Sequence, residues 1–336
     1  MHAESPVADS RFQGLARAVI EGRAPSDEDL SALIEAPDQE VPALSHAALA
    51  VRRACLGHRV SFCAIVNVKS GNCSEDCAFC AQSGRHATNA QRHGFLELPR
   101  IAEAARAARQ AGASRLGLVT SGLAPSGADF DKLEAALAVV REAGLNADAS
   151  PGVLDDGQFA RLRRAGLSAY HHNLETSQAF FPHICTTHDW TEDVDAVRRA
   201  LAAGLPVCSG GLFGLGESWD DRIDLALTLR DLGVTSVPMN FLNPIPGTRL
   251  ENQPVLSRAE ALKILALYRF LLPEAHLRVC GGRPLVFGGD RKAVLLSGAD
   301  GLMIGDYLTT PGEDPALDRR AVEDLGLALE DPAEAA

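Results

Sequence analysis

Three cysteines in one short segment form the densest group of reactive side chains in the sequence. Cys73, Cys77 and Cys80 are spaced C-x3-C-x2-C within GNCSEDCAFCAQS. Three thiolates this close can hold three corners of a 4Fe-4S cluster, which leaves the fourth iron open to an amine and a carboxylate, as in S-adenosylmethionine. A structural zinc site usually has four closed ligands in two C-x2-C pairs, and a disulfide is the other alternative. The spacing favours an iron–sulfur cluster with an open iron.

A second group of polar residues lies in the segment YHHNLETS. His171, Asn173 and Glu175 alternate there, so they would share one face of a β-strand. The alternative is that they are polar residues filling the interior of a barrel. The glycine-rich segment 210–217, GGLFGLGE, lacks the Lys-Ser/Thr of a phosphate-binding loop and also the dinucleotide-binding pattern.

The elements that must position these residues follow a recurring pattern of helix, glycine and apolar β-rich run. Glycine just past a helix end adopts the left-handed conformation at little cost, so each repeat predicts a helix, a stop and a strand. The glycines are Gly112, Gly144, Gly166, Gly204, Gly233 and Gly298. Strands are predicted at residues 62–68, 116–120, 145–149, 169–174, 207–211, 236–241, 277–280 and 301–304.

Four stretches carry the apolar spacing of amphipathic helices. Asp129 is a candidate cap for the first stretch, and Ser257 with Glu260 matches a capping box at the start of the last. The stretches are residues 129–143, 191–203, 220–232 and 257–272.

Eight strands that alternate with helices predict an α/β fold, a closed (β/α)8 barrel of the TIM type with a helical N-terminal lead-in. A doubly wound open sheet is the alternative. Residues 1–55 would form the lead-in, residues 56–310 the barrel, and residues 311–336 a C-terminal helix and frayed tail. The three cysteines follow the first strand, in a loop on the face where the active sites of such barrels lie.

The composition excludes several classes of protein. The 336 residues are 46% hydrophobic and 23% charged, which is typical of a globular chain. A net charge of −12 argues against nucleic acid as the main partner. We expect no membrane span, because no apolar run approaches ~18 residues, and no secretory signal at the N-terminus. Clustered cysteines in such a chain more often bind metal or do chemistry than form disulfides.

These motifs give the sequence its resemblance to known families. C-x3-C-x-aromatic-C after the first strand is the signature of the radical S-adenosylmethionine superfamily, and Phe79 occupies the aromatic position. Further blocks, in the same order over about residues 60–310, make the chain similar to the biotin synthase family. The blocks are SGNCSEDCAFCAQS, YHHNLETS, VCSGGLFGLGES, VPMNFLNPIPGT, RVCGGR and GADGLMIGDYLTT.

The resemblance implies a barrel, usually a homodimer, that inserts sulfur between two unactivated carbons of dethiobiotin. The 4Fe-4S cluster would donate an electron to S-adenosylmethionine, and the resulting 5′-deoxyadenosyl radical would take hydrogen from the substrate. A second iron–sulfur cluster would supply the sulfur. The implied partners are an external, flavodoxin-like electron donor and iron–sulfur assembly proteins, and the implied location is the cytoplasm.

The resemblance also assigns roles to single residues. The positions matching Asn173 and Glu175 contact the ribose of S-adenosylmethionine, where a carboxylate can accept from both hydroxyls. Gly214 belongs to a backbone platform beside the adenosyl group. Asn240 matches an asparagine that contacts the ureido group of dethiobiotin, and His171 lies near the same substrate, where an asparagine is common in the family.

The ligands of the second cluster depart from the family pattern. Cys208 matches one of its cysteines and Arg278 its unusual arginine ligand, but Gly117 and Asp148 stand where the other two cysteines are expected. The usual two-iron cluster therefore cannot form here with its usual ligands.

Five cysteines lie outside the motif, and any single one is best explained as a small buried hydrophobic residue. As a set they offer other ligands for a second cluster. Cys280 shares a strand face with Arg278, and Cys63 is expected to face the interior. We prefer Cys208, Cys280 and Cys63 with Arg278 as ligands, with Cys185 in reserve and Cys55 as a bystander.

Two other functions stay open at this point. One is a radical S-adenosylmethionine enzyme of the same architecture that matures a cofactor and acts on a different small substrate. The other is a non-catalytic electron-transfer or iron–sulfur carrier protein, which would rarely need a complete barrel.

Overall fold

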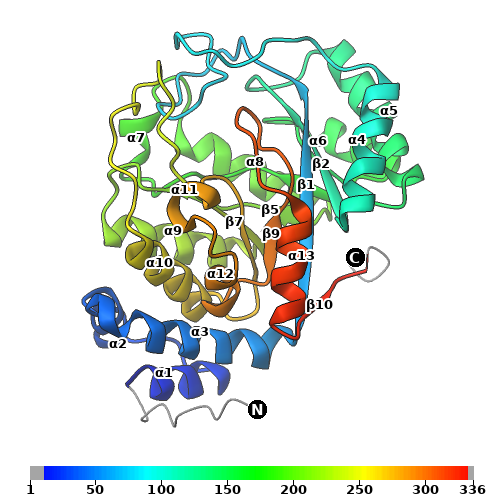
Figure 1. The fold of residues 1–336 in the computed structure, drawn as a ribbon. Helices are drawn as coiled ribbons and strands as arrows, with labels where there is room; N and C mark the ends of the chain where they lie inside the picture. Colours follow the sequence, from blue (N-terminus) through cyan, green and yellow to red (C-terminus); the bar gives the residue numbers. More distant parts are fainter. Residues whose placement is uncertain (1–10, 332–336) are drawn as a thin grey trace.

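Eight parallel strand positions form a closed ring in the computed structural model, which describes residues 11–331 (Figure 1). β1 pairs with β2 on one side and with β9 on the other, and this second pairing closes the ring. β5 and β6 share one position, and β10 lies outside the ring, parallel to β1. The strands are β1 (Arg59–Lys69), β2 (Arg115–Thr120), β3 (Asn146–Ser150), β4 (Ala169–His171), β5 (Val207–Cys208), β6 (Gly211–Phe213), β7 (Ser236–Phe241), β8 (His276–Val279), β9 (Gly301–Met303) and β10 (Ala328–Leu329). The predicted (β/α)8 barrel is confirmed.

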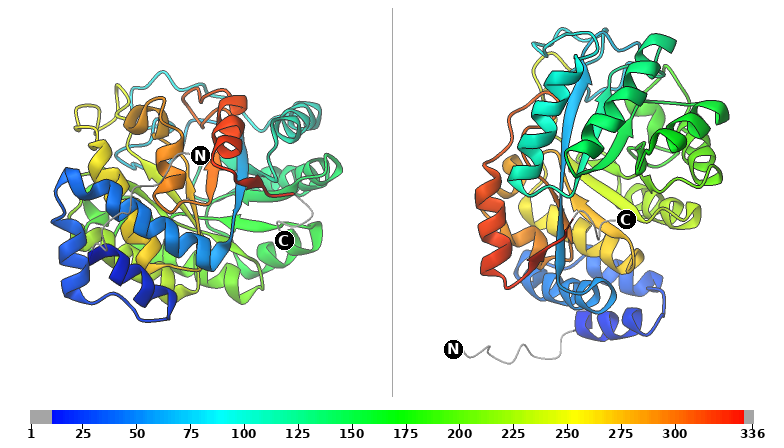
Figure 2. Two further views of the ribbon diagram at one scale, coloured as in Figure 1. Left: turned by 60° about the horizontal axis from the view of Figure 1, so that its bottom comes forward. Right: turned by 90° about the vertical axis from the view of Figure 1, so that its right-hand side faces the viewer.

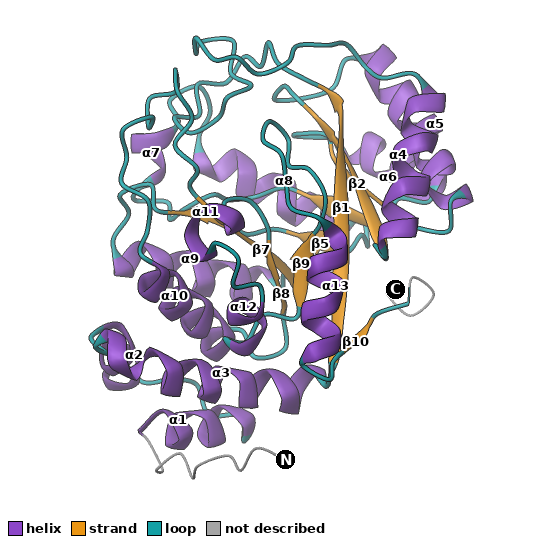
Figure 3. Cartoon of the chain, viewed as in Figure 1, coloured by secondary structure: helices purple, strands orange, loops and turns teal. Residues whose placement is uncertain are grey.

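Helices surround the strands, as the colouring by secondary structure shows (Figure 3). No helix within residues 11–331 is long and apolar enough to cross a membrane. The helices are α1 (Arg11–Ile20), α2 (Asp27–Ile34), α3 (Val41–Leu56), α4 (Leu98–Ala111), α5 (Gly127–Glu142), α6 (Asp156–Ala165), α7 (Phe181–Ile184), α8 (Trp190–Ala202), α9 (Trp219–Leu232), α10 (Arg258–Leu271), α11 (Arg283–Phe287), α12 (Lys292–Leu296) and α13 (Pro315–Asp324), with a 3₁₀ turn η1 (Asp38–Glu40).

The N-terminal lead-in is helical, as predicted, and covers one end of the barrel. Two views place α1, α2 and α3 at this end, opposite the loop that follows β1 (Figure 2). Leu33, Leu44 and Val51 are fully buried in the common core. Arg52 is also buried, and its guanidinium donates to the carbonyl oxygens of Gly57 and Arg59 where α3 passes into β1.

The glycines that were expected to end helices all have positive φ. Two expected caps differ from the structure. Ser126, and not Asp129, caps α5, because its Oγ accepts from the Asp129 amide at 3.2 Å. Ser257 caps α10 in the expected way, but the Glu260 carboxylate binds Arg222 at 2.7 Å and does not complete a capping box.

The fifth strand position is interrupted, where the sequence predicted one strand over residues 207–211. Pro238 on the neighbouring β7 has no N–H to donate to the ladder, so pairing lapses between β5 and β6. Gly210 lies so close to β7 that a Cβ there would meet the Pro238 carbonyl oxygen at 2.0 Å. Leu212 of β6 lines the cavity described below.

At the C-terminal end, α13 matches the expected short helix, and β10 was not predicted. The Ala328 amide donates to the carbonyl oxygen of His58, just before β1, and the Glu330 amide donates to that of Val60 in β1. The last part of the expected frayed tail, residues 332–336, lies outside the described residues, as do residues 1–10 of the lead-in.

Candidate active site

A cavity of about 450 Å³ lies at the carboxyl ends of the barrel strands. We call it the upper cavity, because the carboxyl end of β1 points upward in Figure 1. Its walls come from the loop after β1, the segment after β4, and the ends of β7 and β8. It brings together most of the residues predicted to act on cofactor and substrate, namely Cys73, Cys77, Phe79, Cys80, His171, Asn173, Glu175 and Asn240.

The loop that carries the three cysteines is folded on itself by backbone and side-chain hydrogen bonds. The Cys73 amide donates to the Gln82 carbonyl oxygen at 3.1 Å, and the Gly84 amide donates to the Cys73 oxygen at 2.8 Å. The Gln82 side-chain oxygen accepts from Asn67 on β1 at 3.2 Å, which anchors the loop to the barrel. Asn72 has a left-handed backbone (φ 52°) just before the first cysteine. These contacts constrain the backbone of the loop that carries the three thiols.

Two of these thiols, Cys77 and Cys80, resist ionisation in the absence of metal. Burial raises the pKa of Cys80 to about 11. A hydrogen bond with Cys185 and burial raise the pKa of Cys77. A bound cation reverses this preference because it stabilises thiolates. The donor set therefore fits a cluster that is held by Cys73, Cys77 and Cys80.

Glu175 enters the upper cavity through an unusual backbone conformation, with φ at 61°. Its carbonyl oxygen accepts from the Leu212 amide at 2.9 Å, and its side chain accepts weakly from Asn173 at 3.4 Å. Burial raises the pKa of Glu175 to about 7. A carboxylate held in this way, with few partners of its own, is available to accept hydrogen bonds from a bound diol.

Asn240 and Gly214 differ in their access to the cavity. The Asn240 amide group is oriented by the backbone, with Nδ2 donating to Gly211 at 3.3 Å and Oδ1 accepting from Gly281 at 3.0 Å. One N–H and one lone pair of Asn240 stay available toward the cavity. Gly214 is not among the residues that line it; its amide donates to Glu217 at 3.0 Å, and a Cβ there would lie 3.0 Å from the Leu256 side chain.

A second cavity, of about 680 Å³, lies deeper in the barrel, and we call it the lower cavity. It reaches the surface beside the exposed Glu274. The four residues suggested as ligands of a second cluster all line it: Cys63, Cys208, Arg278 and Cys280. They come from β1, β5, β8 and the residue that follows β8, so only ring closure brings them together.

The thiols of the lower cavity lie among cationic side chains. Cys63 and Cys280 share a hydrogen bond, which together with Arg278 lowers the pKa of Cys63, even though burial opposes the shift. Burial raises the pKa of Cys208 to about 11. Arg278 donates through Nε to Ser236 at 3.0 Å, and the same hydroxyl contacts Cys208 Sγ at 3.3 Å. These contacts hold the guanidinium beside the sulfurs.

Gly117 and Asp148, which replace the cysteines expected from the resemblance, are direct neighbours on β2 and β3. Asp148 is fully buried and accepts from Arg115 Nε at 2.6 Å and from His171 Nε2 at 3.1 Å. Burial opposes its ionisation, yet Arg115 and His171 lower the pKa of Asp148 to about 2. Arg115 and His171, which both line the lower cavity, thus contact a buried carboxylate at one of the positions where the resemblance predicted a thiolate.

Comparisons with known proteins agree with this geometry. The sequence model described as the radical SAM superfamily matches residues 67–229, and that of the Biotin and Thiamin Synthesis associated domain matches residues 238–328. The biotin synthase of Syntrophus aciditrophicus is 43% identical over 320 residues, with 94% of this chain and 98% of the relative covered. That of Geobacter sulfurreducens is 45% identical, with 94% and 97% covered. The chain belongs to the biotin synthase family.

Solved structures share the fold of this member of the biotin synthase family. The crystal structure of methylornithine synthase superposes with a TM-score of 0.83 at 23% identity, covering 96% of this chain and 98% of that one. The FeFe-hydrogenase maturase of Carboxydothermus hydrogenoformans gives 0.79 at 19% identity, covering 95% and 79%. At such identities the likeness shows the barrel alone.

Within this biotin synthase family member, sequence reasoning missed one group beside the cluster loop. Cys185 is not in the lower cavity; its Sγ lies 4.0 Å from Cys77 Sγ in the upper cavity. It contacts His188, which in turn contacts Glu75 and Asp193. The signal was present as CTTHDW, with a cysteine and a histidine three residues apart, but the partner Glu75 is 113 residues from His188.

Proposed function

We propose that this chain is the enzyme that inserts sulfur into dethiobiotin to form biotin, using S-adenosylmethionine and a 4Fe-4S cluster. One observation carries the proposal. In a member of the biotin synthase family, Cys73, Cys77 and Cys80 line the same cavity as Glu175 and Asn240. The three cysteines that could hold the cluster, the carboxylate of Glu175 that could accept from a diol, and the amide of Asn240 that could pair with a urea thus face one cavity.

Different residues of the upper cavity would bind different parts of S-adenosylmethionine. Cys73, Cys77 and Cys80 would hold the cluster, which when bound supplies the electron that splits the sulfonium. Glu175 and Asn173 would take the ribose hydroxyls. Phe79 lines the cavity from the cluster loop and packs with the apolar group around Phe181, which keeps water from this wall.

The substrate would lie between the upper cavity and the deeper layer of the barrel. Asn240 offers one donor and one acceptor to the ureido group. His171 lines both cavities and is oriented by Asp148, so it stands between the substrate and the sulfur source.

For that source we propose a second iron–sulfur cluster in the lower cavity, with Cys63, Cys208, Cys280 and Arg278 as its ligands. Support comes from the convergence of four donors from different strand positions in one cavity. Three thiols and a guanidinium are the donor types that the resemblance implied, but two of the thiols would come from Cys63 and Cys280 in place of the cysteines expected at Gly117 and Asp148.

The activity test uses cluster-loaded protein under oxygen-free, reducing conditions with excess S-adenosylmethionine. Dethiobiotin should be consumed and biotin formed, as measured by mass spectrometry. Cys80→Ala should abolish cleavage of S-adenosylmethionine, whereas Cys55→Ala, at an exposed cysteine, should match the parent. If loaded protein cleaves S-adenosylmethionine but leaves dethiobiotin unbound and unaltered, the substrate assignment is wrong.

The second cluster is tested by iron and sulfide counts. A variant with Cys63, Cys208 and Cys280 all replaced by alanine should retain about one four-iron cluster's worth of metal and still cleave S-adenosylmethionine. The Cys55→Ala protein is again the matched control. Equal iron and sulfide in the triple variant and the parent would disprove a second cluster at these residues.

The remaining expectations belong to the same proposal. We infer an external, flavodoxin-like electron donor, iron–sulfur assembly proteins as partners, a homodimer and a cytoplasmic location. The eight free cysteines suit a reducing compartment. The division into a lead-in at residues 1–55, a barrel at 56–310 and a C-terminal segment at 311–336 also remains a prediction.

A further inference from the structure

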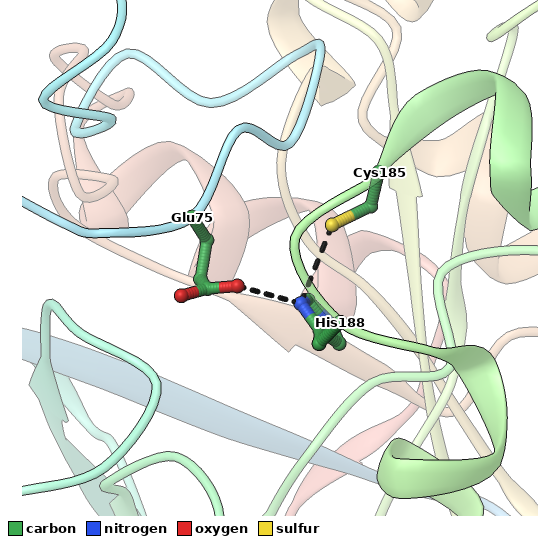
Figure 4. A group of neighbouring side chains, drawn as sticks. All are labelled: Glu75, Cys185 and His188. Carbon is green, nitrogen blue, oxygen red and sulfur yellow. Dashed lines mark hydrogen bonds and ion pairs between the residues drawn. The ribbon is translucent and has the colours of Figure 1, made fainter.

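A group of metal-ligating side chains lies beside the cluster loop but outside the three-cysteine motif. Figure 4 shows Glu75, Cys185 and His188 pointing toward one another. His188 Nδ1 is 2.8 Å from Glu75 Oε2 and 3.3 Å from Cys185 Sγ, and the three donor atoms all lie within 4.8 Å of one another. Glu75 and Cys185 are buried, and the His188 side chain is only 8% exposed.

The opposite side of the imidazole has its own carboxylate. His188 Nε2 lies 3.4 Å from Asp193 Oδ2, and the other Asp193 oxygen contacts His172 Nε2 at 2.7 Å. A carboxylate on the far nitrogen of a histidine is the usual support for a metal-binding imidazole, because it fixes the ring and the tautomer. Here it leaves Nδ1 to face Glu75 and Cys185.

We propose that Glu75, Cys185 and His188 bind a zinc ion, with a water or the Thr187 hydroxyl as the fourth ligand. One sulfur, one nitrogen and one carboxylate oxygen form a donor set that zinc accepts in tetrahedral geometry. Tetrahedral bonds of the usual lengths separate ligand atoms by roughly 3.3–3.6 Å. The two contacts of His188 therefore need shifts of only a few tenths of an ångström. The Glu75 and Cys185 ligand atoms, which lie within 4.8 Å of each other, would have to reach the same spacing. Zinc would take the place of protons on Cys185 and on His188 Nδ1, and both protons would go to solvent.

The charges of the group favour a cation over a simple hydrogen-bonded network. Two carboxylates and a thiol surround the His188 imidazole in a largely buried place. His172 pairs with the far side of Asp193, and the cationic groups of Arg249 and Arg222 contact other residues. A divalent ion beside Glu75, Cys185 and His188 would balance the carboxylates and the thiolate more fully than protons shared with the two histidines. The position near Cys77 does not compete with the cluster, because Cys185 would direct its thiolate toward His188.

The ion would connect the loop that carries the three motif cysteines to the segment between α7 and α8. Glu75 lies between the first two motif cysteines, and Cys185 and His188 lie between α7 and α8. Existing contacts already join these segments, such as the Ala78 amide to the Ile184 oxygen at 2.7 Å. A bound zinc would strengthen this connection in a way that does not depend on substrate.

The test is metal analysis of iron-loaded full-length protein, produced with zinc present and then dialysed against a chelator. We expect about one zinc per chain, and its X-ray absorption spectrum should show one sulfur with nitrogen and oxygen neighbours. Cys185→Ser and His188→Gln should each lower zinc retention more than about tenfold, with the iron content unchanged. The matched control Cys55→Ser should retain zinc like the parent.

The X-ray absorption spectrum of the parent protein tests the zinc site even if a variant folds poorly. Protein without zinc, or with zinc bound only by sulfur, would overturn the proposal, since all-sulfur zinc would occupy other cysteines. Zinc retention that is unaffected by Cys185→Ser would also overturn it. None of these results bears on biotin formation, which the product assay tests separately.

Discussion

Asp148 is a buried carboxylate whose charge is balanced by two neighbours from adjacent strands. Arg115 on β2 and His171 on β4 both contact it, and Arg115 itself is only 14% exposed. An ion pair of this kind contributes little net stability when intact, because both partners lose their hydration. Its removal on one side is costly, because the remaining charge stays buried.

Replacing Asp148 with alanine should therefore lower the free energy of unfolding by about 3–5 kcal/mol, since Arg115 loses its partner in a buried place. Denaturant unfolding of the cluster-free protein measures the loss. The matched control is Asp131→Ala, which breaks an exposed ion pair with Arg161 and should cost less than about 1 kcal/mol. Similar losses in both variants would contradict the role given to Asp148.

Glu175 predicts a pH dependence of cofactor binding. Burial raises its pKa to about 7, so the carboxyl is protonated below that pH and ionised above it. The ionised form accepts from both ribose hydroxyls, so affinity for S-adenosylmethionine should rise as pH increases through about 7. Equilibrium dialysis of cluster-loaded protein from pH 6 to pH 8 would show the rise (roughly one unit on either side of that pKa). Glu175→Gln should bind more weakly with a flatter profile, and an equally steep profile would exclude Glu175 as the titrating group.

At the scale of elements, the broken strand of β5 and β6 shapes the upper cavity. Gly210 and Gly211 let this segment approach β7 and the Glu175 backbone more closely than any other residue could. A Cβ at Gly211 would lie 2.8 Å from the Glu175 carbonyl oxygen, and one at Gly210 would meet Pro238. The left-handed backbone of Glu175 pairs with this segment as an isolated bridge.

Gly210→Ala should displace the segment and lower the free energy of unfolding by roughly 1–3 kcal/mol, through overpacking against the Pro238 backbone. It should also weaken binding of S-adenosylmethionine, because Glu175 moves with its partner strand. The control is Gly127→Ala at the start of α5, where an added Cβ meets nothing within 4 Å. That change should be neutral or stabilising by up to about 1 kcal/mol. Unfolding curves and binding isotherms of the two variants provide the comparison.

Local chemistry explains which elements could be predicted from the sequence. Each helix that ends at a glycine and each buried strand leaves a pattern over several consecutive residues, so the barrel could be predicted from the sequence. The C-x3-C-x2-C loop could be predicted because its three cysteines lie close together in the chain. β10 has two residues and no periodicity, and the break at Pro238 depends on which strand is its neighbour. The group of Glu75 with His188, and that of Arg115 with Asp148, exist only after distant segments have folded together.

At the scale of the whole molecule, the two ends of the barrel are closed by different means. Loops after the strands cover the upper end, whereas α1, α2 and α3 lie at the lower end with β10 alongside β1 (Figure 2). Glu330, just after β10, lines the lower cavity and accepts from Ser114 at 3.2 Å. β10 thus holds Glu330 in the wall around the proposed second cluster.

Ala328→Pro should loosen this wall, because proline cannot donate to the His58 carbonyl oxygen that Ala328 now contacts at 3.1 Å. Iron in excess of one four-iron cluster should then be lost to a chelator several-fold faster than from the parent. Ala328→Ser keeps the backbone donor and should behave like the parent. Iron release followed over time in the three proteins checks this, and equal rates would show that β10 does not protect the lower cavity.

Four residues, Ile65, His171, Pro238 and Met303, line both the upper and the lower cavity. These residues form the layer between the two compartments, and the lower one reaches the surface beside Glu274. Under the proposed function, fresh sulfur can then be delivered from beneath without first emptying the chamber above. The order in which S-adenosylmethionine and sulfur are replenished between turnovers is consequently free. A kinetic scheme for this enzyme should contain two independent recharging branches that meet at the layer around His171.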